Sequence, residues 1–306
     1  MLTFSSQSLL EIIAILEEHL QTIKSGELLE FETVNPDIAS LKYAGSLINE
    51  YIYRGYKAWT DLAEMLYCRM LTPIIKDANT VIIRFEKLNT LNSFHNVEDD
   101  SDKKYGSESI FAKINKTEEP AFLYHYLRAL KNVKIDKRLR VLNIGINSGD
   151  EFDIIKRYSQ NFDKQKLIGI DYCSSAIKLA QNKFPEDNIT FINHDVNHID
   201  SLHLDRFDLI ISIGTLQSRN IDFKTLFKSL VKDYLTDDGA LILGFPNCRW
   251  IDGEMIYGAK AKNYAFPEMS LLYKDIHYCK GYLQKHKFRV TITGKSYVFL
   301  TATSIR

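Results

Sequence analysis

From residue 138 onward, short apolar runs alternate with helix-length segments, and this alternation constrains the fold more than any other feature of the sequence. Strands that alternate with helices form a mostly parallel sheet that is covered on both faces. The apolar runs predict buried strands at 139–144, 166–170, 189–192, 207–213 and 240–245. The segments between them predict helices at 150–160, 174–184, 222–234 and 271–286.

The end of the chain breaks this alternation. Two β-rich runs, 288–293 and 296–303, are separated only by Gly294-Lys295, and this spacing predicts a β-hairpin. The sequence therefore predicts an α/β domain over 136–306 whose seven-stranded, mostly parallel sheet finishes with an antiparallel hairpin strand.

Residues 1–135 have a different pattern. Apolar residues recur at helical spacing over 9–20, 41–51 and 59–66, and a further helix is predicted over 118–133. Ser8 is a candidate N-cap for the first helix. The sequence predicts an N-terminal helical module that acts as a substrate lid or as a dimerisation surface, so a homodimer is one open alternative.

A glycine-containing turn follows the first predicted strand, in the sequence RVLNIGINSGDE of residues 140–151. Gly145 and Gly149 let the backbone pass close to a ligand, and the helix that follows offers free N–H groups. The same turn holds Asn143 and Asn147. The pattern is typical of a cofactor loop, and a plain strand-to-helix turn is the alternative.

Acidic residues follow the next two predicted strands. Asp171 stands 22 residues after Gly149, where a carboxylate in a nucleotide-binding α/β fold accepts hydrogen bonds from both ribose hydroxyls. A helix cap is the alternative role for Asp171. Asp195 follows the third strand, where an acid accepts a hydrogen bond from an adenine amino group. These residues predict a nucleotide site at the carboxyl edge of the sheet.

Taken in order, the glycine turn, the two acids and the terminal hairpin resemble the class I S-adenosylmethionine-dependent methyltransferase family over residues 138–306. The resemblance implies a Rossmann-like fold, S-adenosyl-L-methionine as cofactor, and methyl transfer as the reaction. It also implies a set of cofactor-binding residues. They are Asn143, Gly145, Asn147 and Gly149 in the loop, Asp171 at the ribose, Tyr172, Asp195 and Val196 at the adenine, and Ile213 and Gly214 beside the methyl donor.

Two positions depart from the family pattern, and a further candidate lies upstream of the matched region. The family usually has an acid where Asn143 stands and a glycine where Asn147 stands. Asparagine tolerates left-handed backbone angles, so the turn can form, but Asn143 lacks the charge that favours a cationic sulfonium. Tyr105 lies in an upstream segment that in such enzymes often folds over the cofactor, and a loop aromatic anchored between the two modules is its alternative role.

The segment 246–269 is long for a connection between a strand and a helix, and such connections are commonly functional. Its aromatic and charged residues predict a substrate lid. In the alternative, Trp250 and Tyr257 are buried against the N-terminal helices. The substrate-binding candidates are Gln217, Asn247, Arg249, Trp250 and Tyr257.

Methyl transfer mainly requires alignment of donor and acceptor, and a base is needed only when the acceptor must lose a proton. The catalytic residues are unknown, and His194 and Tyr257 are weak candidates. The loop 212–217, SIGTLQ, lacks the Asn/Asp-Pro-Pro-aromatic signature of enzymes that methylate exocyclic amines. A small-molecule acceptor is therefore the leading prediction, followed by RNA docked on the N-terminal module and then by protein.

Two other classes of function are open. A nicotinamide-dependent oxidoreductase would share the parallel sheet, although the terminal hairpin and Asp195 argue against it. A non-catalytic S-adenosylmethionine-binding protein would keep the fold without the reaction, and Asn143 and Asn147 support this alternative.

Composition adds a few expectations. Lys+Arg and Asp+Glu both number 39, so no positive excess favours a nucleic-acid partner. The four cysteines form no CxxC pair, and no apolar stretch approaches the roughly 20 residues of a membrane span. We expect reduced thiols, a cytoplasmic location and no membrane partner. His194, His198 and His203 match no zinc spacing, so no metal is expected.

Overall fold

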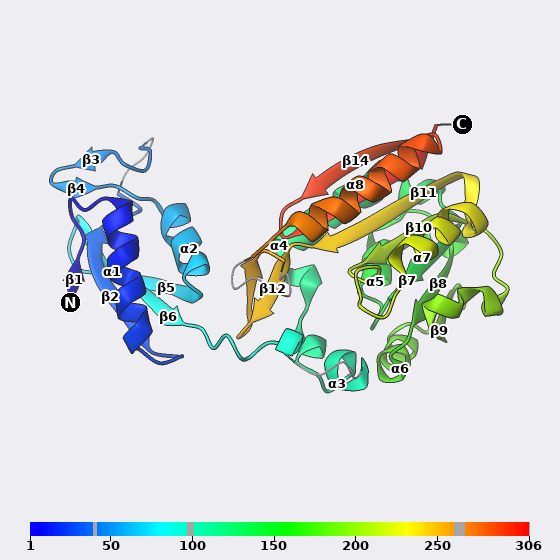
Figure 1. Ribbon diagram of the computed structural model, residues 1–306, viewed down its shortest axis with the longest axis horizontal. Helices are drawn as coiled ribbons and strands as arrows, with labels where there is room; N and C mark the ends of the chain where they lie inside the picture. Colours follow the sequence, from blue (N-terminus) through cyan, green and yellow to red (C-terminus); the bar gives the residue numbers. More distant parts are fainter. Residues whose placement is uncertain (39–41, 97–100, 260–266, 306) are drawn as a thin grey trace. The chain divides into compact units, whose positions relative to one another are not determined.

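The computed structural model describes residues 1–38, 42–96, 101–259 and 267–305. It divides the chain into two compact units (Figure 1). The first unit consists of Met1–Asn96 with Trp250–Tyr257, and the second of Val97–Arg249 with Gly258–Arg306. Residues 97–135, which the sequence assigns to the N-terminal module, thus belong to the second unit.

The second unit is built on a seven-stranded sheet with the order β14-β15-β11-β10-β7-β8-β9. The strands that pair in parallel are β7 (Arg140–Ile144), β8 (Lys166–Asp171), β9 (Ile189–Asn193), β10 (Phe207–Ile213) and β11 (Leu235–Pro246). The antiparallel strands are β14 (Phe288–Gly294) and β15 (Tyr297–Ser304). The predicted α/β fold and its terminal hairpin are confirmed.

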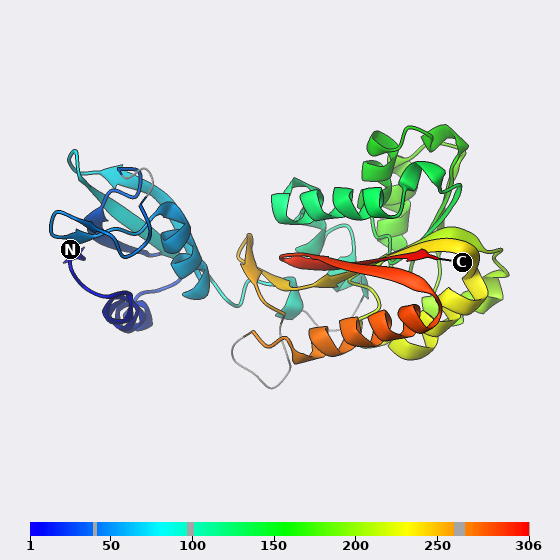
Figure 2. The same cartoon turned by 90° about the horizontal axis from the view of Figure 1, so that it is seen from above.

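Helices cover both faces of this sheet, with α4 on one face and α8 on the other (Figure 2). The helices are α4 (Pro120–Asn132), α5 (Asp150–Tyr158), α6 (Ser174–Lys183), α7 (Phe223–Ser229) and α8 (Ser270–Lys285). On the α4 face, Phe122 packs edge-on against Tyr297, with ring centroids 5.0 Å apart. Within the described ranges, no helix is long and apolar enough to cross a lipid bilayer.

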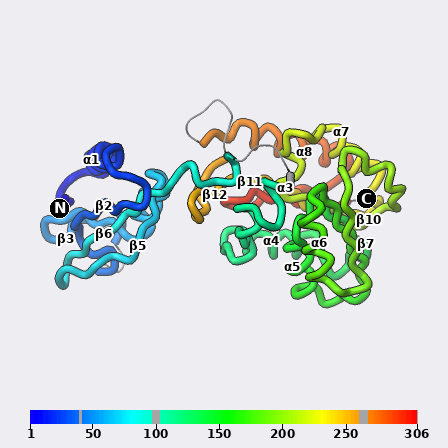
Figure 3. Tube along the Cα trace, turned by 90° about the horizontal axis from the view of Figure 1, so that it is seen from below, coloured from blue at the N-terminus to red at the C-terminus, as the bar shows by residue number. Residues whose placement is uncertain are grey.

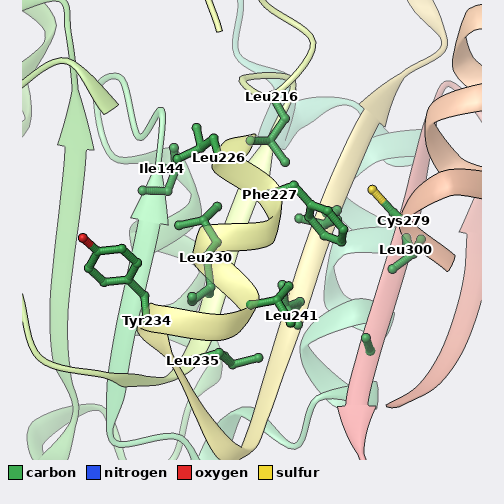
Figure 4. Close-up of a cluster of buried hydrophobic side chains, with 14 of the residues drawn as sticks. Ile144, Leu216, Leu226, Phe227, Leu230, Tyr234, Leu235, Leu241, Cys279 and Leu300 are labelled. Carbon is green, nitrogen blue, oxygen red and sulfur yellow. The ribbon is translucent and has the colours of Figure 1, made fainter. Parts of the chain in front are cut away.

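The main hydrophobic core lies between the sheet and helices α7 and α8 (Figure 4). Phe227 from α7 and Cys279 from α8 are fully buried there against Leu241 of β11 and Leu300 of β15. Burial of Cys279 raises the pKa of its thiol well above the ordinary value. This core fixes the strands whose carboxyl ends carry the candidate site.

The first unit contains a four-stranded sheet with the order β1-β2-β6-β5. Its strands are β1 (Leu2–Thr3), β2 (Leu28–Val34), β5 (Cys68–Ile75) and β6 (Thr80–Lys87). Helices α1 (Leu9–Thr22) and α2 (Tyr56–Met65) contribute to its core, and Figure 3 shows α1 on one side of the strands. Ser8 forms a capping box with Glu11, which confirms the predicted start of the first helix.

This architecture corrects the prediction of an exclusively helical N-terminal module. The helices predicted over 9–20 and 59–66 are present, but the segment described from residue 42 to 51 contains turns and the short strands β3 (Leu47–Ile48) and β4 (Tyr51–Ile52). Gly45 (φ 95°) and Asn49 (φ 55°) take left-handed angles that interrupt a helix. The helical spacing there was misleading because Leu47 is 69% exposed and covers no core.

Most of a hairpin from the connection after β11, from Trp250 to Tyr257, belongs to the first unit. The hairpin comprises β12 (Cys248–Ile251) and β13 (Glu254–Tyr257), which are joined at Asp252-Gly253. Both turn residues have positive φ, as two-residue hairpin turns require. Ile251 and Ile256 pack against Leu88 in a small apolar cluster.

Arg69 is the main polar anchor of this hairpin. Its Nε donates to Glu254 Oε1 at 2.5 Å, and its Nη2 donates to the carbonyl of Asp252 at 2.9 Å. The carboxylate of Asp252 accepts from Asn92 Nδ2 at 2.7 Å. In the alternative interpretation of this segment, Trp250 and Tyr257 are both buried against the N-terminal helices. Trp250 is only 8% exposed, but Tyr257 is 42% exposed, so the structure agrees with that interpretation for Trp250 alone.

We expect Arg69→Ala to lower the free energy of unfolding of the first unit by about 1–2 kcal/mol, because both anchoring hydrogen bonds are lost. Trp59 and Trp250 are the two tryptophans of the chain and both belong to this unit, so tryptophan fluorescence in urea follows its unfolding. Arg84→Ala is the matched control, since Arg84 pairs with Glu30 on the same sheet. Equal losses in both variants would contradict a special role of Arg69.

Candidate functional site

The turn between β7 and α5 contains three left-handed residues, Gly145 (φ 77°), Asn147 (φ 47°) and Gly149 (φ 91°). Asparagine enters this region more readily than most non-glycine residues, which explains how Asn147 preserves the turn. The amide of Gly145 donates to the carbonyl of Ile170 at 2.8 Å and so ties the turn to β8. A Cβ atom on Gly145 would lie 1.7 Å from Thr215 Oγ1, so the loop after β10 lies directly against the turn.

Asp171 lies at the carboxyl end of β8 and connects two loops. Its Oδ2 accepts from the amide of Asn147 at 2.8 Å, and its Oδ1 accepts from the amide of Cys173 at 2.9 Å. Burial raises the pKa of Asp171 above its ordinary value, and the backbone donors only partly oppose this. Each carboxylate oxygen has two lone pairs, so both can accept a further hydroxyl donor.

The residues predicted to bind adenine lie at the neighbouring ends of β8 and β9. Tyr172 is 66% exposed, so its ring is open to a ligand. Asn193 Nδ2 donates to the carbonyl of Tyr172 at 2.8 Å, which joins the two strand ends. Asp195 accepts from the amide of Asn197 at 2.9 Å, and Val196 beside it is buried. These contacts place the predicted ribose and adenine residues side by side.

The ring of His194 contacts residues that follow it closely in the sequence. Its Nε2 lies 2.9 Å from the carbonyl oxygen of His198 and 3.1 Å from Ser201 Oγ. These contacts hold the ring against the short helical segment Val196–Leu202.

Tyr105 meets the glycine turn. It ends α3 (Ser101–Tyr105), and its carbonyl accepts from Asn147 Nδ2 at 3.2 Å. Its ring centroid lies 5.2 Å from that of Phe111 in an edge-to-face arrangement. The segment upstream of β7 therefore contacts the predicted cofactor loop through the backbone of Tyr105.

Several buried polar side chains at the carboxyl edge have atoms without a hydrogen-bond partner among the described residues. Most buried polar groups in folded proteins are hydrogen-bonded, so a cluster of exceptions indicates a place where a ligand completes the network. Both polar atoms of the Asn143 amide are in this state although the residue is only 1% exposed. The other atoms in the cluster are Ser212 Oγ, Gln217 Oε1, Asn247 Oδ1 and Glu151 Oε2.

These atoms lie near one edge of the sheet because of its topology. The register nevertheless pairs Asn143 with Ile211 and Ile144 with Ser212, which places the Asn143 and Ser212 side chains on opposite faces. Asn143 and Ser212 precede the last residues of β7 and β10, Gln217 lies in the loop after β10, and Asn247 directly follows β11. Parallel strands bring their carboxyl ends to one edge, so residues distant in the sequence meet there. Ile213 ends β10 at this edge and Gly214 follows it, and the amide of Gly214 donates to the carbonyl of Gly244 at 2.9 Å.

A buried ion pair adjoins the glycine turn, and the sequence did not reveal it. Lys116 Nζ lies 2.7 Å from Glu151 Oε1, and the two side chains are 15% and 1% exposed. Burial favours a lower pKa for Lys116, but Glu151 and Asp150 outweigh it and raise that pKa. Burial also raises the pKa of Glu151, and Lys116 only partly opposes this rise. In the sequence, the only indication of this pair was Glu151, an acid at a position of α5 that faces the interior.

The predicted substrate residues are divided between the two units. Gln217, Asn247 and Arg249 belong to the second unit, and Arg249 is only 8% exposed. Trp250 and Tyr257 belong to the first unit, where the amide of Tyr257 donates to Glu64 Oε1 at 2.6 Å. Residues 260–266 of the predicted lid lie outside the described residues.

Comparison with known families gives one match in the sequence. The family model described as a methyltransferase domain matches residues 135–290, which is just over half of the chain. None of the curated proteins matches the sequence.

Several solved structures of methyltransferases are similar to part of this chain at low sequence identity. The plantazolicin methyltransferase in complex with SAH is 14% identical, with a TM-score of 0.46 over 65% of this chain and 92% of that one. A SAM-dependent methyltransferase from Aquifex aeolicus is 17% identical, with a TM-score of 0.42 over 63% and 98%. Precorrin-6y C5,15-methyltransferase from Geobacter metallireducens is 12% identical, with a TM-score of 0.41 over 58% and 87%.

Proposed function

The chain belongs to the class I S-adenosylmethionine-dependent methyltransferases, and on this premise we propose that it methylates a small-molecule acceptor held at the carboxyl edge of its sheet. The incompletely paired side chains at that edge, Asn143, Gln217 and Asn247 above all, are the observation that carries the proposal.

The chain's own residues fit the cofactor. S-adenosylmethionine supplies, when bound, a methyl group that the sulfonium already activates. We assign Asp171 to the ribose hydroxyls, because both its oxygens retain acceptor capacity beside the glycine turn. We assign the adenine contacts to Tyr172, Asp195 and Val196, and closure of the site to Tyr105. The remaining walls of the cofactor site are assigned to Asn143, Gly145, Asn147, Gly149, Ile213 and Gly214.

The acceptor is assigned from burial and charge. Gln217 Oε1 and Asn247 Oδ1 are buried acceptors of hydrogen bonds, so they suit a small molecule that enters the domain and brings hydroxyl or amino donors. The equal numbers of basic and acidic residues supply no excess of positive charge for an RNA backbone. These residues align the acceptor and exclude water, which is the main requirement of this reaction.

The N-terminal unit has a proposed role in access to the acceptor. The connection after β11 leaves the second unit at Arg249 and returns at Gly258, and the intervening hairpin is anchored by Arg69. We propose that the first unit serves as a substrate lid or as a dimerisation surface, as the sequence predicts.

Asp171→Asn is expected to weaken S-adenosylhomocysteine binding by at least about 30-fold, because a charged acceptor of two ribose hydroxyls is lost. Calorimetric titration with S-adenosylmethionine, S-adenosylhomocysteine and NAD measures this effect, and NAD should not bind. Asp163→Asn, at an exposed carboxylate, serves as the control. Unchanged affinity in Asp171→Asn would refute the ribose assignment.

Acceptor class is tested with the same proteins. Wild-type protein and labelled S-adenosylmethionine are incubated with pooled metabolites, with total tRNA and with protein extract. We expect label in the small-molecule fraction, at a level that Asp171→Asn strongly reduces. Label confined to RNA or protein would overturn the proposed acceptor, whereas cofactor binding with no transfer to any fraction would favour a non-catalytic binding protein.

A further inference from the structure

The buried pair of Lys116 and Glu151 leaves some of its hydrogen-bonding capacity unused. Glu151 uses Oε1 to accept from Lys116, whereas its Oε2 has no hydrogen-bond partner among the described residues. The Lys116 ammonium has three donors, and within the described part of the chain Glu151 accepts from only one of them. A buried ion pair that leaves hydrogen-bond donors or acceptors without partners destabilises the folded state. A ligand that supplies the missing partners would therefore bind favourably here.

The pair also lies next to the predicted cofactor residues. Glu151 is in the first turn of α5, two residues after Gly149. Lys116 interacts electrostatically with Asp171, the residue assigned to the ribose. Asp171 in turn accepts from the amide of Asn147 in the glycine turn. The pair therefore adjoins the glycine turn, and the same turn is hydrogen-bonded to the residue assigned to the ribose.

We propose that Lys116 and Glu151 form the subsite for the amino-acid end of S-adenosylmethionine, a proposal that rests on the cofactor site assigned above. Lys116 donates to the α-carboxylate, and Glu151 Oε2 accepts from the α-ammonium. An amino acid carries one charge of each sign, and the pair offers the complementary charge to each. When the ligand is bound, Glu151 Oε2 thus gains a hydrogen-bond donor, which none of the described residues supplies.

This assignment also accounts for Asn143. The family usually has a carboxylate at that position, whereas here the amide is neutral and buried. Glu151 places a carboxylate oxygen in the first turn of the following helix, so the α-ammonium of the ligand still meets a hydrogen-bond acceptor near the turn. The pair thus replaces a feature that the glycine turn of this chain lacks.

The test compares two ligands that differ in the amino-acid end. S-adenosylhomocysteine carries it, and 5′-methylthioadenosine keeps the adenosine and thioether without it. The variant is Lys116→Met with Glu151→Leu, since replacing both partners of a buried pair by apolar residues commonly preserves folding. Glu151→Gln is a second, more conservative variant, and Lys113→Met, at an exposed lysine in the same region, is the control.

Calorimetry should show that the double variant binds S-adenosylhomocysteine about 100-fold more weakly and 5′-methylthioadenosine as tightly as the wild type. Glu151→Gln should show a smaller loss with the same selectivity. An unchanged affinity for S-adenosylhomocysteine, or an equal loss for both ligands, would overturn the subsite. If the wild type bound neither ligand, the cofactor site itself would be wrong, and this assignment with it.

Discussion

Gly145→Ala is expected to destabilise the second unit by about 2–5 kcal/mol and to abolish binding of S-adenosylhomocysteine. The backbone at Gly145 has a φ of 77°, which costs an alanine about 1–2 kcal/mol. The new Cβ would also lie 1.7 Å from Thr215 Oγ1 and 2.6 Å from Thr215 Cβ, and overpacking of this kind costs about 1–3 kcal/mol. Relief of the clash would push the turn and the loop after β10 apart, and both line the proposed site.

Urea denaturation followed by circular dichroism, together with calorimetry, measures both effects. Gly281→Ala is the matched control, because Gly281 lies in α8 with no heavy atom within 4 Å of a Cβ built there. That variant should gain roughly 0.5–1 kcal/mol from the better helix propensity of alanine. Adding Thr215→Gly to Gly145→Ala removes the clash but keeps the positive φ, so it should restore part of the stability. Wild-type binding in Gly145→Ala would refute the close packing of the two loops.

The second large effect is expected for Lys116→Met, which should lower the free energy of unfolding by about 3–5 kcal/mol. The variant leaves the carboxylate of Glu151, which is 1% exposed, without its counter-charge. Lys116→Met combined with Glu151→Leu should recover most of this loss, because no buried charge is then unpaired. Similar losses in the single and double variants would show that packing, and not charge, explains the effect.

The pH dependence of Lys116→Met follows from the direction of the pKa shift. Burial already raises the pKa of Glu151 above 4.5 in the wild type, and removal of Lys116 raises it further. Asp150 and the buried Tyr126 also face Glu151, and neither supplies a positive charge. A raised carboxyl pKa means that the folded state binds more protons than the unfolded state, so stability falls as pH rises above about 4.5.

Denaturation of Lys116→Met should therefore show a smaller deficit at pH 5 than at pH 8. Both the wild type and the double variant serve as references at each pH, since other groups titrate in the same range. A deficit that is independent of pH would contradict the burial of an ionised Glu151 in this variant.

Short-range sequence patterns were sufficient to predict the seven-stranded sheet and many of the residues at its carboxyl edge. Some features depend only on residues a few positions apart, so they can be recognised in the sequence. They are the strand and helix periods, the glycine turn and the Gly294-Lys295 hairpin. The carboxyl ends of parallel strands then bring Asp171 and Asp195 together by topology alone. The same reasoning predicted that Asn147 would keep the turn, and its φ of 47° confirms this.

Long-range packing decided the rest. The spacing over 41–51 looked helical, yet its apolar residues have no core to cover, and β2, β5 and β6 are strands because they pair with one another. Most of the hairpin after β11 belongs to the N-terminal unit through Arg69, which lies 185 residues before Glu254. Lys116 meets Glu151 across 35 residues of chain. Sequence periodicity therefore determined the elements, whereas contacts between distant residues determined which side chains meet in the site.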